Sequence, residues 1–212
     1  TELLERITGI VPDSVARVHD TQTEALGLGN AILCAESVVG DEPFAILLAD
    51  DLIRSSGPGA LSQMVEVHGQ SGASVIGVEE IPLERTSSYG IVGVNEGENG
   101  QRTVHTIVEK PSPEAAPSRL GVVGRYILDP AIFRHLHEVK PGAGGEIQLT
   151  DGIAAMLGRH PVLAYPFTGV RYDCGSHRGF IRATIDYALE HDSLREDILG
   201  HMQGQLEKTG RA

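Results

Sequence analysis

The chain has 212 residues, 41% of them hydrophobic, with 26 glycines and 11 prolines, a composition typical of an ordered α/β protein rather than a fibrous or disordered one. A chain of this size buries roughly 70% of its unfolded surface, enough for a substantial core. The formal charge of −12 argues against nucleic acid as a partner, because that affinity depends on clustered Lys and Arg. The longest apolar run has six residues, so we expect no membrane span.

The first half of the sequence alternates between apolar segments of helical and of strand spacing. This alternation predicts a sheet with a parallel core. In chain order, we expect the end of a helix at 2–7, a short strand at 15–19, a helix at 30–39, a buried strand at 44–49, a helix at 60–68 capped by Gly69, and a central strand at 74–78.

The second half begins with segments rich in β-formers, separated by Gly, Asn and Pro clusters, which predict an antiparallel addition to that core. We expect strands at 89–94, 103–108 and 122–128, a helix at 147–157, a strand at 162–167, an amphipathic helix at 179–191 with Phe180, Ile181, Ile185, Ala188 and Leu189 on its inner side, and a final fraying helix from Asp192. The pattern as a whole predicts an α/β fold, with a mixed, mostly parallel sheet flanked by helices in a single domain over residues 1–212.

The two cysteines, Cys34 and Cys174, are far apart and follow no metal-ligand spacing. The sequence therefore indicates neither a zinc site nor a disulfide framework. No secretory segment is recognised at the start of the sequence. These features favour a reducing, cytoplasmic location, and phosphate bound by so acidic a protein would need a local metal ion and one or two lysines.

Asp50 and Asp51 directly follow the apolar run 44–49. Residues at the carboxyl ends of strands in an open α/β sheet lie at the ligand crevice, where carboxylates suit Mg²⁺ and, through it, phosphates. Taken alone, such residues are more often simple turn residues. Lys110 and Asp173 favour the interpretation of Asp50 as a metal ligand. Together the three residues give two acids and one lysine at successive strand ends.

Gln22 precedes a glycine-rich turn, with Gly27 and Gly29 at the start of a predicted helix. Glycines allow a flat ring or a phosphate to approach the backbone closely. An ordinary strand-to-helix turn is the simpler alternative for so short a motif.

Glu109 and Lys110 close the predicted strand 103–108. Glu109 is able to accept hydrogen bonds from sugar hydroxyls, and Lys110 is able to neutralise a phosphate. The alternative is an exposed ion pair with no ligand. Gly90, Tyr126 and Glu146 likewise have alternative explanations as turn, packing and helix-start residues.

Seven sequence blocks, taken together and in order, resemble the bacterial UTP–glucose-1-phosphate uridylyltransferases over essentially the whole chain. The blocks at Glu146 and at Asp173 favour this family over its thymidylyl relatives. The seven blocks are Gln22 with Gly27-Leu28-Gly29, Leu47-Leu48-Ala49-Asp50-Asp51, Ser88-Tyr89-Gly90-Ile91-Val92, Glu109-Lys110-Pro111, Leu120-Gly121-Val122-Val123-Gly124-Arg125-Tyr126, Gly142 to Asp151, and Tyr172-Asp173-Cys174-Gly175-Ser176.

The resemblance implies a Rossmann-like nucleotidyltransferase fold, Mg²⁺ as cofactor, and transfer of a uridylyl group from UTP to glucose 1-phosphate, giving UDP-glucose and pyrophosphate. It also implies a cytoplasmic homo-oligomer. Under this resemblance, Gln22, Gly27 and Gly29 would recognise the uracil, and Asp50 and Asp173 would hold the metal ion. Gly90 and Glu109 would contact the glucose, Tyr126 and Glu146 would line the sugar end of the site, and Lys110 would bind the phosphate of glucose 1-phosphate. Lys110 and Asp50 would be the catalytic residues.

The sequence also departs from the family pattern. It has Asp20-Thr21 where Val-Arg is common, and Asn30 and Ala49 where His and Pro are usual. We expect these changes to tune binding. The family's opening strand, its Gly-x-Gly-Thr-Arg loop and its Pro-Lys pair are absent from this sequence, so we expect an N-terminally incomplete fragment with little or no transferase activity by itself.

Two other functions remain open from the sequence. One is a thymidylyl or other sugar-phosphate nucleotidyltransferase on the same scaffold. The other is a non-catalytic module that binds a nucleotide sugar.

Overall fold

The centre of the molecule is a six-stranded mixed sheet with the strand order β1-β6-β3-β7-β5-β4. The computed structural model describes residues 12, 14–97, 100–142 and 145–210, so the predicted helix end at 2–7 lies outside the described residues. The strands are β1 (Phe44–Leu47), β3 (Ser74–Glu80), β4 (Gly90–Glu96), β5 (Arg102–Glu109), β6 (Leu120–Leu128) and β7 (Val162–Pro166).

Strand directions in this sheet confirm the predicted fold class. β3 and β7 form the parallel pair, and the antiparallel pairings of β6 with β1, β3 and β4 give β1, β3, β4 and β7 one common direction. β5 and β6 run the opposite way. A separate two-stranded sheet joins β2 (Asp51–Arg54) to β8 (Val170–Asp173), with Asp51 opposite Asp173.

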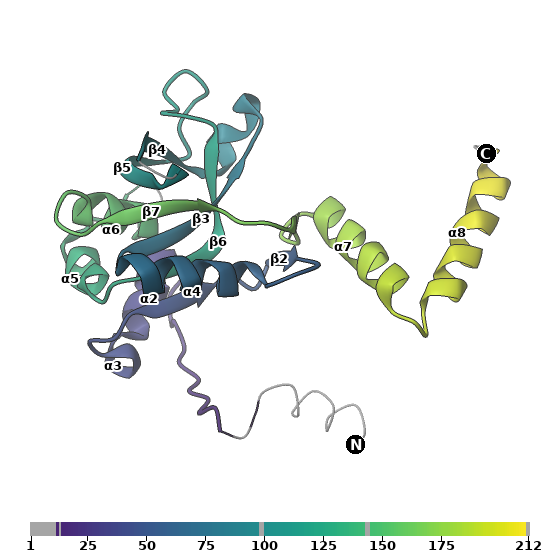
Figure 1. The fold of residues 1–212 in the computed structure, drawn as a ribbon, viewed down its shortest axis with the longest axis horizontal. Helices are drawn as coiled ribbons and strands as arrows, with labels where there is room; N and C mark the ends of the chain where they lie inside the picture. The colour runs from purple at the N-terminus through teal and green to yellow at the C-terminus, as the bar shows by residue number, and fades with distance from the viewer. Residues whose placement is uncertain (1–11, 13, 98–99, 143–144, 211–212) are drawn as a thin grey trace.

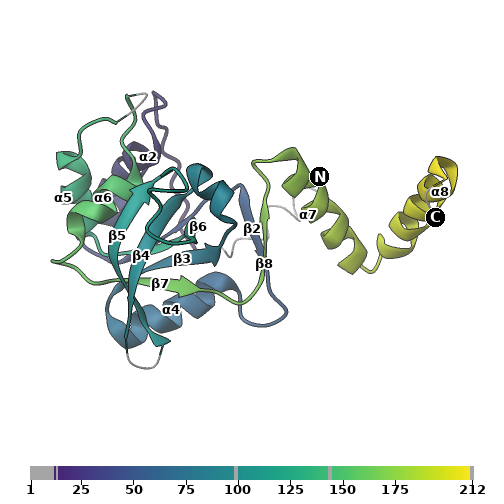
Figure 2. The ribbon, with the colours of Figure 1, turned by 90° about the horizontal axis from the view of Figure 1, so that it is seen from above.

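Helices cover both faces of the large sheet, as Figure 2 shows. Alternate residues of β3 decide which helix meets which face. Val75 packs with Met64 on one face, whereas Ile76 belongs to the larger cluster with Ile153 on the other. The helices are α2 (Leu28–Cys34), α3 (Glu36–Val39), α4 (Ala60–Ser71), the 3₁₀ helix η1 (Leu83–Ser88), α5 (Ala131–Glu138), α6 (Leu149–Met156), α7 (His177–Glu190) and α8 (Arg195–Thr209).

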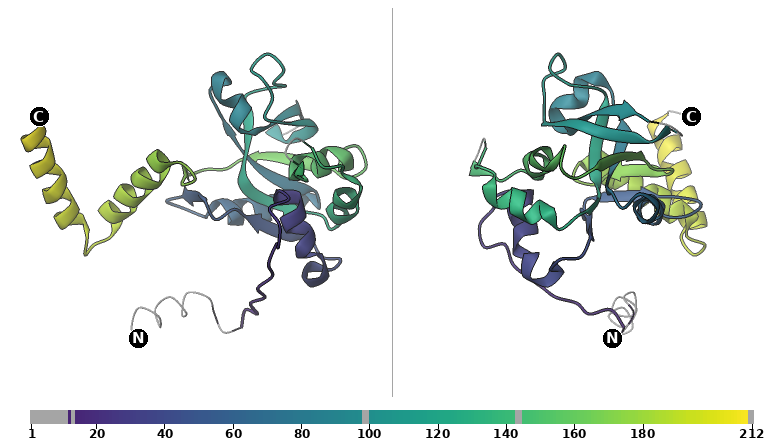
Figure 3. Two further views of the ribbon diagram at one scale, coloured as in Figure 1. Left: turned by 180° about the vertical axis from the view of Figure 1, so that it is seen from behind. Right: turned by 60° about the vertical axis from the view of Figure 1, so that its left-hand side comes forward.

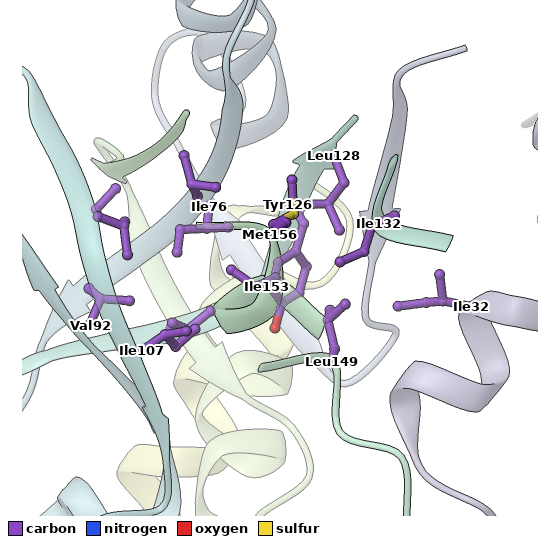
Figure 4. Packing of buried hydrophobic residues seen from close by; sticks show 14 of the residues in the cluster. Ile32, Ile76, Val92, Ile107, Tyr126, Leu128, Ile132, Leu149, Ile153 and Met156 are labelled. Carbon is purple, nitrogen blue, oxygen red and sulfur yellow. The ribbon is translucent and has the colours of Figure 1, made fainter. Parts of the chain in front are cut away.

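The main core lies between the sheet and the helices α2, α5 and α6. Ile76, Tyr126 and Ile153 belong to this cluster, as Figure 4 shows. Full burial of an aliphatic side chain contributes about 1.5–3 kcal/mol. The predicted central position of β3 is confirmed, because its residues from Ser74 to Val78 are all buried.

The apolar run before Asp50 was expected to form a buried strand, and this prediction is wrong. β1 lies at the edge of the sheet and pairs with β6, and within the described residues no strand pairs with its other side. Leu47 is 53% exposed. Apolar composition predicts that a strand packs against a core, but it does not specify how many neighbouring strands cover it.

Three predicted elements differ in extent. Residues 15–19 form no strand, because Val15 lies in a bend and residues 16–19 belong to no regular element. The expected helix at 30–39 is divided at Ala35 into α2 and α3. α4 continues past Gly69 and ends at Gly72, whose left-handed backbone (φ 65°) lets its N–H reach a helix carbonyl.

The two C-terminal helices project away from the sheet, as Figures 1 and 3 show. α7 is attached to the β2–β8 ribbon by the Arg54–Glu190 ion pair at 2.6 Å. The expectation that Phe180 and Ile181 face inward is wrong, because these side chains are 60% and 56% exposed. The amphipathic pattern was read correctly as a helix, but the sheet ends before it reaches that face. None of the described helices is long and apolar enough to span a membrane.

Candidate active site

A cavity of about 340 Å³ lies where the large sheet, α6 and the β2–β8 ribbon meet. Four residues predicted from the sequence line it, namely Gly90, Glu109, Tyr126 and Asp173. They come from three strands of the large sheet and from the end of β8. The structure therefore brings together residues that are up to 83 positions apart in the sequence.

The two predicted metal-binding carboxylates lie close together, and one of them, Asp173, lines this cavity. Asp50 lies in the turn after β1, and Asp173 ends β8. A β-carbon added to Gly175 would lie 3.2 Å from Asp173 Oδ1 and 3.3 Å from Asp50 Oδ2. The Cys174 N–H also donates to the Asp50 carbonyl at 2.7 Å, so the backbone between the two acids fixes their approach.

This pair of carboxylates is chemically suited to Mg²⁺. Both supply hard oxygen atoms, and glycine at position 175 leaves the space between them free of a side chain. Among the described residues no cluster of three or more His, Cys, Asp or Glu forms a fuller metal site. Two carboxylates suffice for Mg²⁺ in phosphate-binding sites, because waters and substrate oxygens complete its coordination.

Asp51 and Arg171 form a buried ion pair that the sequence did not reveal. Arg171 Nε lies 2.6 Å from Asp51 Oδ1, and both side chains are less than a tenth exposed. Asp51 Oδ2 also accepts the Gly124 N–H at 2.7 Å. The available signal was the spacing of Arg171 and Asp173, since residues two apart in a strand share one face.

Burial lowers the pKa of the Arg171 guanidinium, but its hydrogen bonds to Asp51 and Tyr89 outweigh burial and raise that pKa above the usual value. Arg171 is therefore charged throughout the working pH range of any protein. It also lines the cavity.

The end of the cavity that the sequence predicts to hold a sugar is built on close packing at Gly90. Gly90 and Glu109 are register partners on β4 and β5. A β-carbon on Gly90 would lie 2.8 Å from Thr150 Cγ2 and 3.3 Å from Glu109 Oε2. Thr150, which the sequence did not single out, donates its hydroxyl hydrogen to Glu109 Oε2 at 3.0 Å. Glycine is needed here because any side chain would displace one of these two groups.

Lys110 directly follows β5 in an uncommon backbone conformation. Its φ of 45° lies in the left-handed region, which costs a non-glycine residue roughly 1–2 kcal/mol. The Lys110 N–H donates to the Tyr89 carbonyl at 2.9 Å. Its Nζ lies 3.4 Å from Glu109 Oε1, and 57% of the side chain is exposed. The lysine is thus placed beside the cavity with an accessible charge.

Tyr126 and Glu146 reach the site in different ways. Burial raises the pKa of Tyr126, and the nearby charges of Glu109 and Asp51 raise it further, so its hydroxyl stays protonated and able to donate. Glu146 Oε2 accepts a hydrogen bond from Gln148 Nε2 at 2.7 Å. Gln148 lines the cavity, so Glu146 orients a lining residue.

Gln22 and the glycine turn lie together at another side of the site. Gln22 Nε2 donates to the Gly27 carbonyl at 3.1 Å and to Asn30 Oδ1 at 2.8 Å. The Gly29 N–H donates to the Ile147 carbonyl at 2.9 Å, and a β-carbon on Gly29 would lie 2.8 Å from that oxygen. Backbone packing thus explains Gly29, while Leu28 lines the cavity. A role of this turn in reading a base stays a prediction.

The fold and the paired carboxylates beside a polar cavity are those of a nucleotidyltransferase, and the family model described as nucleotidyl transferase matches residues 3–190. The UTP–glucose-1-phosphate uridylyltransferase of Bacillus subtilis is 42% identical over 209 residues, covering 98% of this chain and 70% of that protein.

Two solved structures are also similar. One is UDP-glucose pyrophosphorylase complexed with UDP-glucose, with a TM-score of 0.77, 44% identity, and coverage of 80% of this chain and 65% of that one. The other is the UTP-bound enzyme from Acinetobacter baumannii, with a TM-score of 0.83, 41% identity, and coverage of 95% and 70%. The chain belongs to the UTP–glucose-1-phosphate uridylyltransferase family of nucleotidyltransferases.

Proposed function

We propose that this chain carries the sites for uridylyl transfer from UTP to glucose 1-phosphate. The observation that carries the proposal is the convergence of Asp50 and Asp173 on Gly175, beside a cavity that Asp173 lines together with Gly90 and Glu109. A metal-phosphate end and a sugar end thus adjoin in one site. The solved relatives named for bound UDP-glucose and bound UTP support the choice of ligands.

In this reaction an oxygen of the sugar phosphate forms a bond to the α-phosphorus of UTP. The bond from that phosphorus to the bridging oxygen of the β-phosphate breaks, and pyrophosphate leaves with the electron pair. Both reactants are anions, so positive charge must be placed between them in a site of reduced dielectric. Lys110 supplies such a charge to the phosphate of glucose 1-phosphate.

Mg²⁺ held by Asp50 and Asp173 would supply further charge against the phosphates. Glu109 would accept hydrogen bonds from sugar hydroxyls, and the Thr150 hydroxyl keeps its carboxylate in place. Tyr126 and Glu146 would complete the sugar end. Gln22, with Gly27 and Gly29, would recognise the uracil, since amide groups match the donor and acceptor edges of a base.

The test is a coupled assay for UDP-glucose with UTP, glucose 1-phosphate and Mg²⁺, in which reactions without the sugar phosphate serve as the blank. We expect UTP to be used in preference to dTTP at equal concentration. A preference for dTTP would assign the chain to a thymidylyl reaction instead. Calorimetric binding of UDP-glucose without turnover would identify a non-catalytic nucleotide-sugar-binding module, and neither binding nor turnover would overturn the proposal.

The family also supports a homo-oligomeric, cytoplasmic protein of carbohydrate metabolism as part of this proposal. The oligomeric state can be measured directly by light scattering. A mass equal to that of one chain at micromolar concentration would contradict the homo-oligomer.

A further inference from the structure

Arg171 lies between the two ends of the candidate site and contacts both. On one side its Nε bonds Asp51 Oδ1 at 2.6 Å. On the other side its Nη1 donates to the Tyr89 hydroxyl oxygen at 3.2 Å, and its guanidinium lies 5.3 Å from the centre of the Tyr89 ring. A single planar side chain therefore joins the β2–β8 ribbon to the segment that precedes β4.

The contact with Asp51 leads directly to the metal-binding acids. Asp51 follows Asp50 in the chain and is the register partner of Asp173. Its other oxygen is held by the Gly124 N–H, and its carbonyl accepts from Arg125 Nη2 at 2.6 Å. Any movement of Asp51 would therefore shift both Asp50 and Asp173 relative to the large sheet.

The contact with Tyr89 leads to the sugar end. Tyr89 immediately precedes Gly90, and its carbonyl accepts the Lys110 N–H at 2.9 Å. That hydrogen bond holds Lys110 in its left-handed conformation, which the residue would not favour alone. Arg85 stacks on the same ring at 5.4 Å and donates to the same hydroxyl oxygen at 3.0 Å, so Tyr89 is fixed between two guanidinium groups.

We propose that Arg171 is a positioning residue that sets the separation between the metal-binding carboxylates and the sugar-phosphate lysine. The inference rests on the proposed function, in which the carboxylates hold a metal ion against the phosphates of UTP and the lysine binds the phosphate of glucose 1-phosphate. A fork-shaped guanidinium can hold a carboxylate and a hydroxyl at fixed directions, whereas a lysine ammonium offers a single point of charge. Charge alone therefore does not replace arginine at this position.

The first experiment measures metal affinity in the full chain carrying Arg171→Lys, using Mn²⁺ and the electron paramagnetic resonance signal of the free ion. Loss of a group that orients metal ligands typically weakens metal binding by about 10–100-fold, and we expect a loss in that range. The matched control is Arg102→Lys, because Arg102 also pairs with an acid, Glu96, at 2.9 Å across a strand pair but lies outside the cavity lining. An Mn²⁺ affinity unchanged by Arg171→Lys would overturn the proposal.

The second experiment needs no ligand and follows amide hydrogen exchange at two positions. In Arg171→Lys we expect faster exchange of the Cys174 N–H, which bonds the Asp50 carbonyl, and of the Lys110 N–H, which bonds the Tyr89 carbonyl. A purely structural loss would accelerate exchange through the core, including β3. Unchanged exchange rates at both amides would overturn the positioning role of Arg171. Failure of the parent chain to bind metal or nucleotide would instead contradict the proposed function, and the exchange experiment can be interpreted in either case.

A second variant, Tyr89→Phe, separates the two ends. It removes the hydroxyl to which Arg171 donates but keeps the ring and the backbone carbonyl. We expect faster exchange at Lys110 with little change at Cys174 and an Mn²⁺ affinity within about twofold of the parent. This variant also keeps the proposal testable if Arg171→Lys does not fold, because exchange at Lys110 that stays at the parent rate would contradict the proposal.

Discussion

The proposed metal end and the proposed sugar end of the site are held together by different physical means. At the metal end, buried charge and backbone hydrogen bonds set the positions, through the Arg171–Asp51 pair and the bond from Cys174 to Asp50. At the sugar end, close packing sets them, since Gly90 leaves room for Thr150 and Glu109. Substitutions should therefore act through lost charge at the first end and through lost space at the second.

The largest effect is expected for Asp173→Asn at the metal end. The substitution keeps the size of the side chain but removes half of the anionic metal site. We expect Mn²⁺ binding to fall below detection and any UDP-glucose formation by the parent chain to be lost with it, because the remaining carboxylate supplies only one anionic ligand. The exposed acid Asp41 provides the control Asp41→Asn, for which neither quantity should change. A parent-like Mn²⁺ titration of Asp173→Asn would remove Asp173 from the metal site.

The next effect concerns Lys110, which belongs to the sugar end but acts by charge. Lys110→Gly removes the cation and relieves the left-handed backbone strain, while Lys110→Ala removes the cation and keeps the strain. A charge-assisted hydrogen bond contributes about 1.5–3 kcal/mol, so we expect the Kd for glucose 1-phosphate in calorimetry to rise about 10–100-fold in both.

The two Lys110 variants should differ in stability. Glycine loses more backbone entropy on folding than alanine, but it adopts φ 45° without strain. We therefore expect the free energy of unfolding in urea to be equal in the two variants or higher for Lys110→Gly, by up to about 1 kcal/mol. Equal Kd values for glucose 1-phosphate in both variants and the parent would show that Lys110 is only a surface ion-pair partner of Glu109.

Gly90→Ala tests the packing at the sugar end. The new β-carbon would meet Thr150 Cγ2 at 2.8 Å, and such overpacking typically costs about 1–3 kcal/mol. Gly93 is the matched control on the same strand, because its β-carbon would meet Thr106 Cγ2 at 2.6 Å away from the cavity. Both variants should lose stability in urea, but only Gly90→Ala should weaken UDP-glucose binding in calorimetry. Equal binding by the two variants would show that Gly90 serves the fold alone.

Local patterns carried enough information for most of the architecture. The apolar run at 74–78 predicted the central strand β3, because strands that are covered on both faces need apolar residues throughout, and the β-formers at 122–128 predicted the strand β6. The same rule misplaced β1, since an edge strand with one paired neighbour can be equally apolar in sequence. Phe180 and Ile181 were misjudged for a related reason: amphipathic spacing identifies a helix but not whether a partner surface lies beside it.

The candidate site was predictable only in part. Asp50 was found because it directly follows the apolar run 44–49, whereas Asp173 was assigned to the metal through the resemblance of its sequence block to the family, since no strand was predicted at the position of β8. The spacing of Arg171 and Asp173 places both on one face of a strand, but it does not identify the partner of Arg171, because Asp51 is 120 residues away. Thr150 was missed for the same reason, since its hydroxyl meets Glu109 only through the packing of α6 against β5.

The smallest effect should come from Thr150, and it connects the two kinds of support. Thr150→Val keeps the shape but removes the hydrogen bond to Glu109 Oε2, which is worth about 1 kcal/mol and should weaken UDP-glucose binding by about fivefold. Thr150→Ser keeps that hydrogen bond and removes the Cγ2 methyl group. The new β-carbon of Gly90→Ala would collide with this methyl group. The double variant Gly90→Ala with Thr150→Ser should therefore recover most of the stability lost in Gly90→Ala alone. Urea unfolding of the two single variants and the double variant measures this coupling, and strictly additive losses would place the Gly90 clash elsewhere.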